Sequence, residues 1–193
     1  MMKRLCSFVF VLVSALFPIV LSAEGLRAAD LIPGDAVFVL EILKPKELLD
    51  NLLSHRIWKQ IKGEPAIQKA LKGKKAKELI SLVRFFEERF STDWRSGLKK
   101  LLGGGVALAA GPQGNWALLI EPEDPQMLKE LHATMRVLSA QEALKEGRSP
   151  PVKESSCFGV QVYRLNNGSI HAFLGTTFVI ASSSKAFKAI VDT

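Results

Sequence analysis

The chain has 193 residues, of which 48% are hydrophobic and 23% are charged, and its formal net charge is +7 at pH 7. This length and balance suit one compact domain with a buried core, and they exclude a fibrous or generally disordered protein. A disulfide framework is also excluded, because Cys6 lies in an N-terminal apolar run and leaves Cys157 as the only thiol beyond it. We interpret Cys157 as a small buried apolar side chain, with an intermolecular disulfide or a reactive thiol as the alternatives.

The N-terminus has the layout of a secretory signal peptide over residues 1–23. Two basic residues precede an apolar run from 5 to 20 that contains no charge, and small residues follow it. We expect cleavage after Ala23, with Ala28 and Ala29 as weaker sites. The alternative is an uncleaved membrane anchor, since about 18 apolar residues can just span a bilayer.

Residues 24–33 are predicted to form a linker and residues 34–193 a single domain outside the cytoplasm, either periplasmic or extracellular. The last predicted helix reaches Val191 without a stop signal. As an alternative, the domain is truncated at its C-terminus and the chain is the N-terminal part of a longer protein.

The first half of the domain predicts one strand followed by helices. A Pro-Gly-Asp turn precedes an apolar segment rich in strand formers, and apolar residues then recur at helical spacing. We assign one aromatic stripe to the core, and it consists of Leu79, Val83, Phe86 and Phe90. Ser91 or Thr92 is the expected N-cap of the next short helix. The predicted elements are a strand over 36–42 and helices over 45–61, 66–71, 76–90 and 94–102.

The second half predicts a hairpin, a long helix and a three-stranded meander. Asp124 is the expected N-cap of the long helix, with Pro125 in its first turn. The stretch "RSPPVKESS", residues 148–156, is predicted to be a loop because adjacent prolines exclude regular structure. The predicted elements are hairpin strands over 105–110 and 116–121, a helix over 125–146, meander strands over 158–165, 169–174 and 177–182, and a helix over 183–193.

The dipeptide Asn167-Gly168 predicts a two-residue type I′ turn within the meander, because both of its residues tolerate a positive φ. Such a turn places Leu165 opposite Ile170 and Arg164 opposite His171.

Three segments share a strand-turn-helix layout: "GDAVFVLEILKPKELL", "GNWALLIEPEDPQMLKEL" and "GTTFVIASSSKAFKAI". Their recurrence favours repeated strand-helix units in one sheet. We therefore predict an α+β fold with a mixed, largely antiparallel sheet and helices packed against it.

The glycine triplet at residues 103–105 does not have the form of a phosphate loop. Such a loop needs a strand that leads through glycines into a helix, whereas here a helix precedes the triplet and a strand follows it. We predict that Gly103 is a helix C-cap with positive φ and that Val106 to Ala110 are buried in the sheet.

Ser182 and Lys185 match the Ser-x-x-Lys spacing of serine acyl-transferases, in which the lysine helps to activate the serine. The two other motifs that accompany this spacing in such enzymes, Ser-Asp-Asn and Lys-Thr-Gly, do not occur in the sequence. Helix capping by Ser182, Ser183 and Ser184 is the simpler interpretation.

No group of residues has a recognised metal-binding spacing. The three histidines are scattered, and a small acidic group is divided between a strand end and a helix start, where negative charge complements the helix dipole. The histidines are His55, His132 and His171. The acidic residues are Glu121, Glu123 and Asp124.

The segment from Lys44 to Lys100 is basic, with 15 basic and 7 acidic residues. Its densest part could attract an anionic polymer or lipid head groups, but a solvated helix end is the favoured interpretation. We do not expect nucleic acid as a partner, because the run has no interleaved aromatic residues for base stacking. The lysines of this part are Lys72, Lys74, Lys75 and Lys77.

Four segments together resemble exported bacterial proteins that carry an uncharacterised α+β domain. They are "LIPGDAVFVLEI", "LLSHRIWKQIKGEPAIQKAL", "LLGGGVALAAGPQGNWALLIEP" and "TFVIASSSKAFKAIVD". The resemblance spans residues 31–192 through hydrophobic pattern and glycines. It implies no established activity, and it transfers no functional residue to this chain.

The sequence therefore predicts a non-catalytic exported protein with a binding or structural role in the cell envelope. It would present its sheet or the basic segment, residues 44–100, to a protein or an anionic polymer. We predict no catalytic, cofactor-binding or metal-ligating residue, and membrane contact only if the signal segment is uncleaved. The alternatives are a hydrolase that uses Ser182 and Lys185, and an electrostatic binder of anionic envelope polymers.

Overall fold

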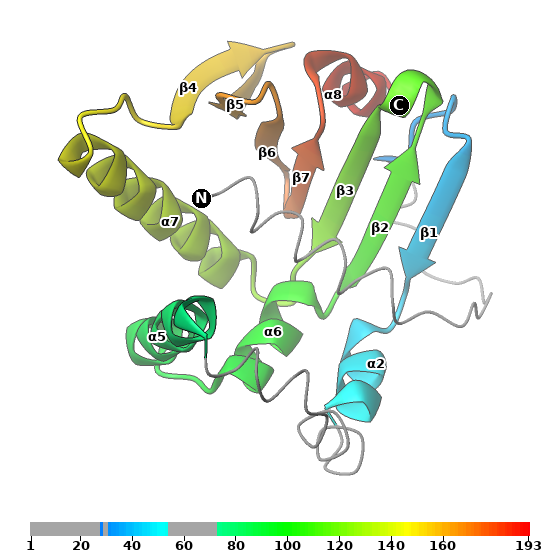
Figure 1. Cartoon of the computed structure of the whole chain (residues 1–193). Helices are drawn as coiled ribbons and strands as arrows, with labels where there is room; N and C mark the ends of the chain where they lie inside the picture. Colours follow the sequence, from blue (N-terminus) through cyan, green and yellow to red (C-terminus); the bar gives the residue numbers. More distant parts are fainter. Residues whose placement is uncertain (1–27, 29–30, 54–72) are drawn as a thin grey trace.

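The computed structural model of the protein describes residues 28, 31–53 and 73–193, and this part is an α+β fold (Figure 1). Its sheet has seven strands in the order β1-β2-β3-β7-β6-β5-β4, and every neighbouring pair is antiparallel. The strands are β1 (Phe38–Ile42), β2 (Gly105–Ala110), β3 (Trp116–Glu121), β4 (Val152–Cys157), β5 (Val160–Leu165), β6 (Ile170–Leu174) and β7 (Thr177–Ala181). The helices are α2 (Pro45–Leu52), α5 (Lys74–Phe90), α6 (Trp94–Leu102), η2 (Pro112–Gly114), α7 (Pro125–Lys145) and α8 (Ser184–Val191).

The predicted signal peptide lies outside the described residues, as do the end of the predicted helix over 45–61 and all of the stretch 66–71. Among the described helices, none is long and apolar enough to cross a membrane. α2 begins at Pro45, as predicted, because proline fits the first helical turn, where its missing N–H is not needed.

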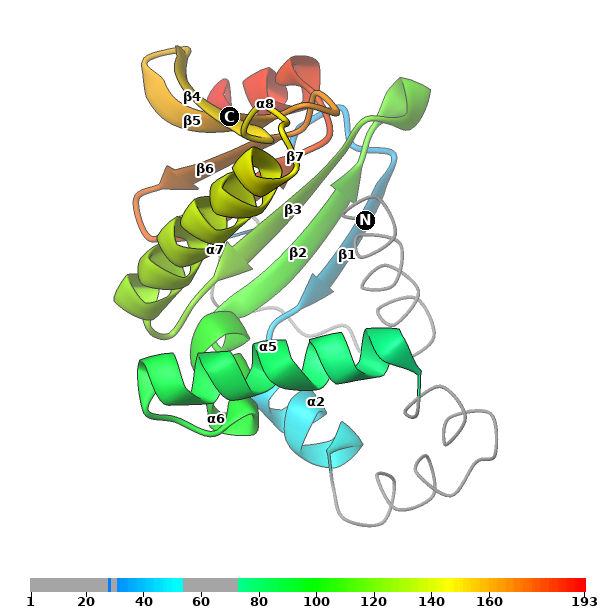
Figure 2. The same cartoon turned by 60° about the vertical axis from the view of Figure 1, so that its left-hand side comes forward.

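The three strand-helix units are present as β1–α2, β3–α7 and β7–α8. Because β3 and β7 are antiparallel neighbours, the chain leaves them at opposite ends of the sheet. The helices that follow pack on opposite faces. α7 lies on the same side as α5 and α6, and α8 lies on the other (Figures 1 and 2).

α8 packs on a face of the sheet that is rich in alanine. Phe187 and Ile190 of α8 are 0% and 1% exposed, and they belong to one buried cluster with Leu119 and Val179 of the central strands. Cys157 also packs there, although it is half-buried and not fully buried as predicted. The sheet alanines of this cluster are Ala107, Ala117, Ala172 and Ala181. Their small side chains let a short helix approach the strands closely.

The opposite face is covered by longer side chains. Phe178 of β7 is buried with Met127 and Leu128 of α7. Phe86 and Phe90 of α5 pack against this cluster, with their ring centroids 5.0 Å apart. These contacts confirm that the aromatic end of the predicted stripe belongs to the core.

The prediction of a loop over residues 148–156 is wrong in its second half, where β4 pairs with β5. Pro150 and Pro151 lie just before the strand, and they do not prevent the residues that follow them from pairing with β5. The polar segment Lys153–Ser156 is exposed at the edge of the sheet. Because an edge strand there buries little surface, it needs no alternation of apolar residues, and the sequence pattern does not reveal it.

The predicted register of the β5–β6 hairpin is also wrong by one residue. Arg164 is opposite Ile170, and the N–H of Leu165 donates to the carbonyl of Ser169 at 2.9 Å. The loop therefore has three residues and ends on Gly168, which has φ of 88°. A third loop residue in the left-handed conformation replaces the type I′ turn. His171 consequently lies opposite Tyr163 rather than Arg164.

The glycine triplet forms a corner, but not with the predicted conformation. Gly103 ends α6 with φ of −68°, and the positive φ, 151°, belongs to Gly105. Gly104, between them, must be small, because a Cβ on it would lie 2.7 Å from the carbonyl oxygen of Glu121. Beyond the corner, burial alternates along β2, so that Ala107 and Ala109 are buried while the residues between them are half-buried.

The N-cap of α6 is Asp93 rather than Ser91 or Thr92. Its carboxylate accepts from the N–H groups of Arg95 and Ser96, and hydrogen bonds from Ser96 lower the pKa of Asp93 below its ordinary value. Ser91 instead ends α5 in the left-handed conformation, with φ of 47°.

Candidate functional site

Ser182 and Lys185 make separate contacts at the junction of β7 and α8. The hydroxyl of Ser182 accepts a hydrogen bond from the N–H of Trp116 at 2.9 Å. The ammonium of Lys185 donates to Oε1 of Gln113 at 3.3 Å. Two different residues of the β2–β3 hairpin therefore hold Ser182 and Lys185. Neither hydrogen bond joins Lys185 to Ser182, as catalysis by a lysine base and a serine nucleophile would require.

The neighbouring serines also have structural partners. Ser183 is the N-cap of α8, since its hydroxyl accepts from the N–H of Ala186 at 3.1 Å and donates to Oδ1 of Asn115 at 2.9 Å. Ser184 accepts from a guanidinium nitrogen of Arg164 at 2.7 Å. Capping therefore explains one serine of the three, and the other two connect α8 and its preceding turn to the sheet.

The hollow beside Lys185 is small. It has a volume of about 50 Å³ and is lined mostly by small and apolar residues of β2, β3 and α8, including Ala109 and Trp116. Sites for small molecules usually have several hundred Å³. This hollow is therefore too small for a substrate-sized ligand.

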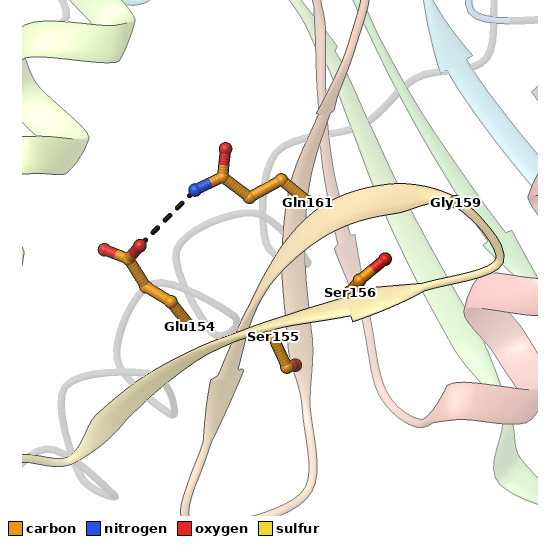
Figure 3. A pocket seen from close by; sticks show the side chains of 5 residues that line it. All are labelled: Glu154, Ser155, Ser156, Gly159 and Gln161. Atoms are coloured by element: carbon orange, nitrogen blue, oxygen red, sulfur yellow. Dashed lines mark hydrogen bonds between the residues drawn. The ribbon is translucent and has the colours of Figure 1, made fainter.

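A larger hollow, of about 440 Å³, lies beside the β4–β5 hairpin. Figure 3 shows that its lining comes from this one hairpin, with Glu154 and Gln161 side by side and joined by a hydrogen bond of 3.3 Å. The carboxylate of Glu154 also accepts from Arg136 of α7. Because one exposed hairpin supplies all five of its lining residues, the hollow lacks the converging walls of a ligand pocket. The lining residues are Glu154, Ser155, Ser156, Gly159 and Gln161.

Several lysines of the basic segment are paired with carboxylates. Lys46 lies 2.6 Å from Glu123, Lys44 lies 3.2 Å from Glu47, and Lys99 pairs with Asp50. Of the densest part, Lys72 lies outside the described residues, while positions 74, 75 and 77 fall in the first turns of α5. Pairing reduces the positive field that the composition suggests, because each carboxylate cancels one charge locally.

The residues of the small acidic group have separate roles. Asp124 caps the helix by accepting from the N–H of Met127 at 2.9 Å, as predicted, and Glu123 pairs with Lys46 of α2. Within the described ranges, no set of three or more histidine, cysteine or acidic side chains is placed to hold a metal ion.

Two of the three histidines, which the sequence places 39 residues apart, lie next to each other. His132 of α7 and His171 of β6 have ring centroids 5.9 Å apart, between the helix and the sheet. His55 lies outside the described residues. The sequence did not indicate this pair, because the predicted register placed His171 beside Arg164.

The edge strand β1 and the residue before it carry exposed apolar side chains. Val37, just before the strand, is 79% exposed, and Phe38 and Val39 are 53% and 42% exposed. β1 pairs with β2 along one side only, and its other side is an end of the sheet. Among the described strands none pairs with this outer side, so backbone N–H and C=O groups there lie beside exposed apolar side chains.

No family model matches the chain, and comparisons with curated proteins and with solved structures found no significant match. Function must therefore be inferred from the described residues themselves.

Proposed function

We propose that this chain is a non-catalytic exported protein that binds an extended, apolar segment of another envelope protein by adding it as a strand beside β1. The observation that carries the proposal is the exposed apolar edge formed by Val37, Phe38 and Val39, which we call the β1 edge. The export part of the proposal is supported by the signal-like residues 1–23 and by the resemblance to exported bacterial proteins.

The two edges of the sheet differ in a way that supports this role. β4, at the other end, exposes lysine, glutamate and serine side chains, which discourage another strand from pairing. Between Val37 and Leu40, the β1 edge has no charge and no proline. Strand addition would satisfy its free backbone groups through main-chain hydrogen bonds, and the alternating side chains would select an apolar partner.

Other functions receive less support from the contacts. Ser182 and Lys185 are held by different partners, and the hollow beside Lys185 has a volume of only about 50 Å³. Electrostatic binding of an anionic polymer would draw on the basic segment, residues 44–100, where three lysines outside its densest part are in ion pairs, namely Lys44, Lys46 and Lys99. Addition of an apolar strand to the β1 edge requires neither a serine activated by a lysine nor a set of unpaired lysines.

Strand addition can be tested by selecting binders from a displayed library of random peptides against the full chain. We expect the enriched peptides to be rich in β-branched and apolar residues. The double variant Val37→Lys/Val39→Lys should weaken their binding at least tenfold, because it places two charges on the edge while keeping its backbone. Fluorescence anisotropy with the labelled peptides measures this change.

Ser155→Lys/Ser156→Lys is the matched control, since it adds two lysines to the polar edge at β4 and should leave peptide binding unchanged. A library that yields no binder, or binders unaffected by the lysines at Val37 and Val39, would show that the β1 edge is not a docking site.

A further inference from the structure

His132 lies at the centre of an aromatic cluster between α7 and the sheet. Its ring centroid is 4.6 Å from that of Tyr163, 5.2 Å from Phe178, 5.6 Å from Phe173 and 5.9 Å from His171. His171 in turn contacts Phe178 at 5.7 Å. We call these five residues the histidine cluster. One helix thus places a titratable ring among rings from three strands.

Positive charge predominates around this cluster. From α7, the guanidinium of Arg136 lies 4.0 Å from the centroid of Tyr163, and the ammonium of Lys129 lies 5.8 Å from that of Phe173. From β4, the carboxylate of Glu154 has an electrostatic effect on His132 that raises its pKa, and it already pairs with Arg136. β5 contributes the phenol of Tyr163, β6 contributes His171, and β7 contributes the uncharged Phe178.

Arg136 adds a second constraint on charge. Its Nε is buried and has no hydrogen-bond partner, although one guanidinium nitrogen binds Glu154. A cation with an unsatisfied polar atom therefore lies beside the histidine cluster, and the described carboxylate nearest to it, Glu154, is already paired with that cation. Protonation of both histidines would add two like charges with ring centroids 5.9 Å apart.

We propose that the histidine cluster is an acid-sensitive contact, through which protonation of His132 and His171 releases α7 from strands β5, β6 and β7. While both rings are neutral, they pack against the aromatic side chains in edge-on and tilted contacts. Once charged, they repel each other and Arg136, and they regain hydration when the helix moves away. The described residues of the core around α8, on the other face of the sheet, include no histidine, and we expect this core to stay closed.

The direction of the pH effect follows from the two histidines. Burial lowers the pKa of His132 and that of His171 from 6.5 to about 4, and for His132 the nearby His171 and Arg136 act in the same direction. Between pH 6.5 and about pH 4, the two histidines bind protons when α7 has moved away from the sheet and stay neutral while it is packed there. The opening equilibrium therefore rises as pH falls, by at most tenfold per pH unit for each histidine.

Hydrogen exchange of the full chain at pH 7 and at pH 5 tests the proposal, with each rate expressed relative to an unstructured peptide. We expect amide protection in α7 to fall at least tenfold between these two pH values, while protection in α8 changes little. In His132→Phe/His171→Phe, which keeps two aromatic rings without a titrating group, the fall in α7 should disappear. His55→Gln is the control, and it should keep the fall.

The proposal is overturned if α7 and α8 lose protection equally in the unmodified chain, or if the double phenylalanine variant keeps the fall. Should that variant fail to fold, an NMR titration of the imidazole protons of the unmodified chain decides the matter. Both histidines should then titrate below about pH 5, whereas midpoints near 6.5 would contradict the proposal.

Discussion

Gly104 shows how one residue decides the geometry of the corner between α6 and β2. Its N–H donates to the carbonyl of Glu121 at 2.9 Å, so the backbone of the corner lies directly against the end of β3. A side chain on Gly104 would enter the space that this carbonyl occupies. Position 104 must therefore be small, and the residue that makes it so, Glu121, lies 17 positions later in the chain.

We expect Gly104→Ala to lower the free energy of unfolding by about 1–3 kcal/mol, because the added methyl group would displace the backbone of Glu121. Urea denaturation measures this change. Gly34→Ala is the control, since its Cβ would meet nothing within 4 Å, and it should change stability by less than about 0.5 kcal/mol. Equal stability of the two variants would contradict the role of Gly104.

At the scale of elements, α8 depends on the sheet more than on its own sequence. It has 8 residues, and isolated helices of that length are marginal in water. Its cap at Ser183 satisfies one N–H, but its buried side, with Ala186, Phe187 and Ile190, supplies most of the contact with the alanine-rich face.

We expect Phe187→Ala to cost about 3–5 kcal/mol in the free energy of unfolding, because the ring is 0% exposed and its loss leaves a cavity against the strands. Phe158→Ala removes the same ring from a site that is 50% exposed, and it should cost less than about 1 kcal/mol. Thermal unfolding followed by circular dichroism compares the two. A similar loss in both variants would show that α8 does not anchor this side of the sheet.

At the scale of the whole molecule, the strand order divides the sheet into a centre and two unlike edges. β3 and β7 lie in its interior and carry side chains from both buried clusters. β1 and β4 pair on one side only, and one presents apolar residues where the other presents polar ones. Stability should therefore decrease from the central strands outward.

We expect native-state hydrogen exchange to be slowest in β3 and β7 and fastest in β1 and β4, because amides in the centre open only when most of the sheet opens. Mass spectrometry of peptic fragments resolves these strands. Protection of β1 as high as that of β3 in the isolated chain would mean that the β1 edge is already covered, and it would contradict strand addition there.

Local signals in the sequence determined the elements whose ends are fixed by nearby residues. Asp124 and Pro125 define the start of α7, and the bounds of the β2–β3 hairpin agree with those predicted, because capping and alternation act within a few positions. The α+β class followed from three strand-helix units that form as predicted. The signal-like N-terminus is likewise a property of composition, and export remains a prediction.

Only the tertiary structure decided which distant segments meet. β4 is a strand because β5 pairs with it, and Gly104 is needed because Glu121 is close. A one-residue change in register placed His171 opposite Tyr163, on the side of the sheet where α7 brings His132. The exposure of the β1 edge likewise depends on strand order, which no local pattern encodes. The physical reason is the same in each case, since packing and pairing energies depend on neighbours in space, whereas sequence patterns report neighbours along the chain.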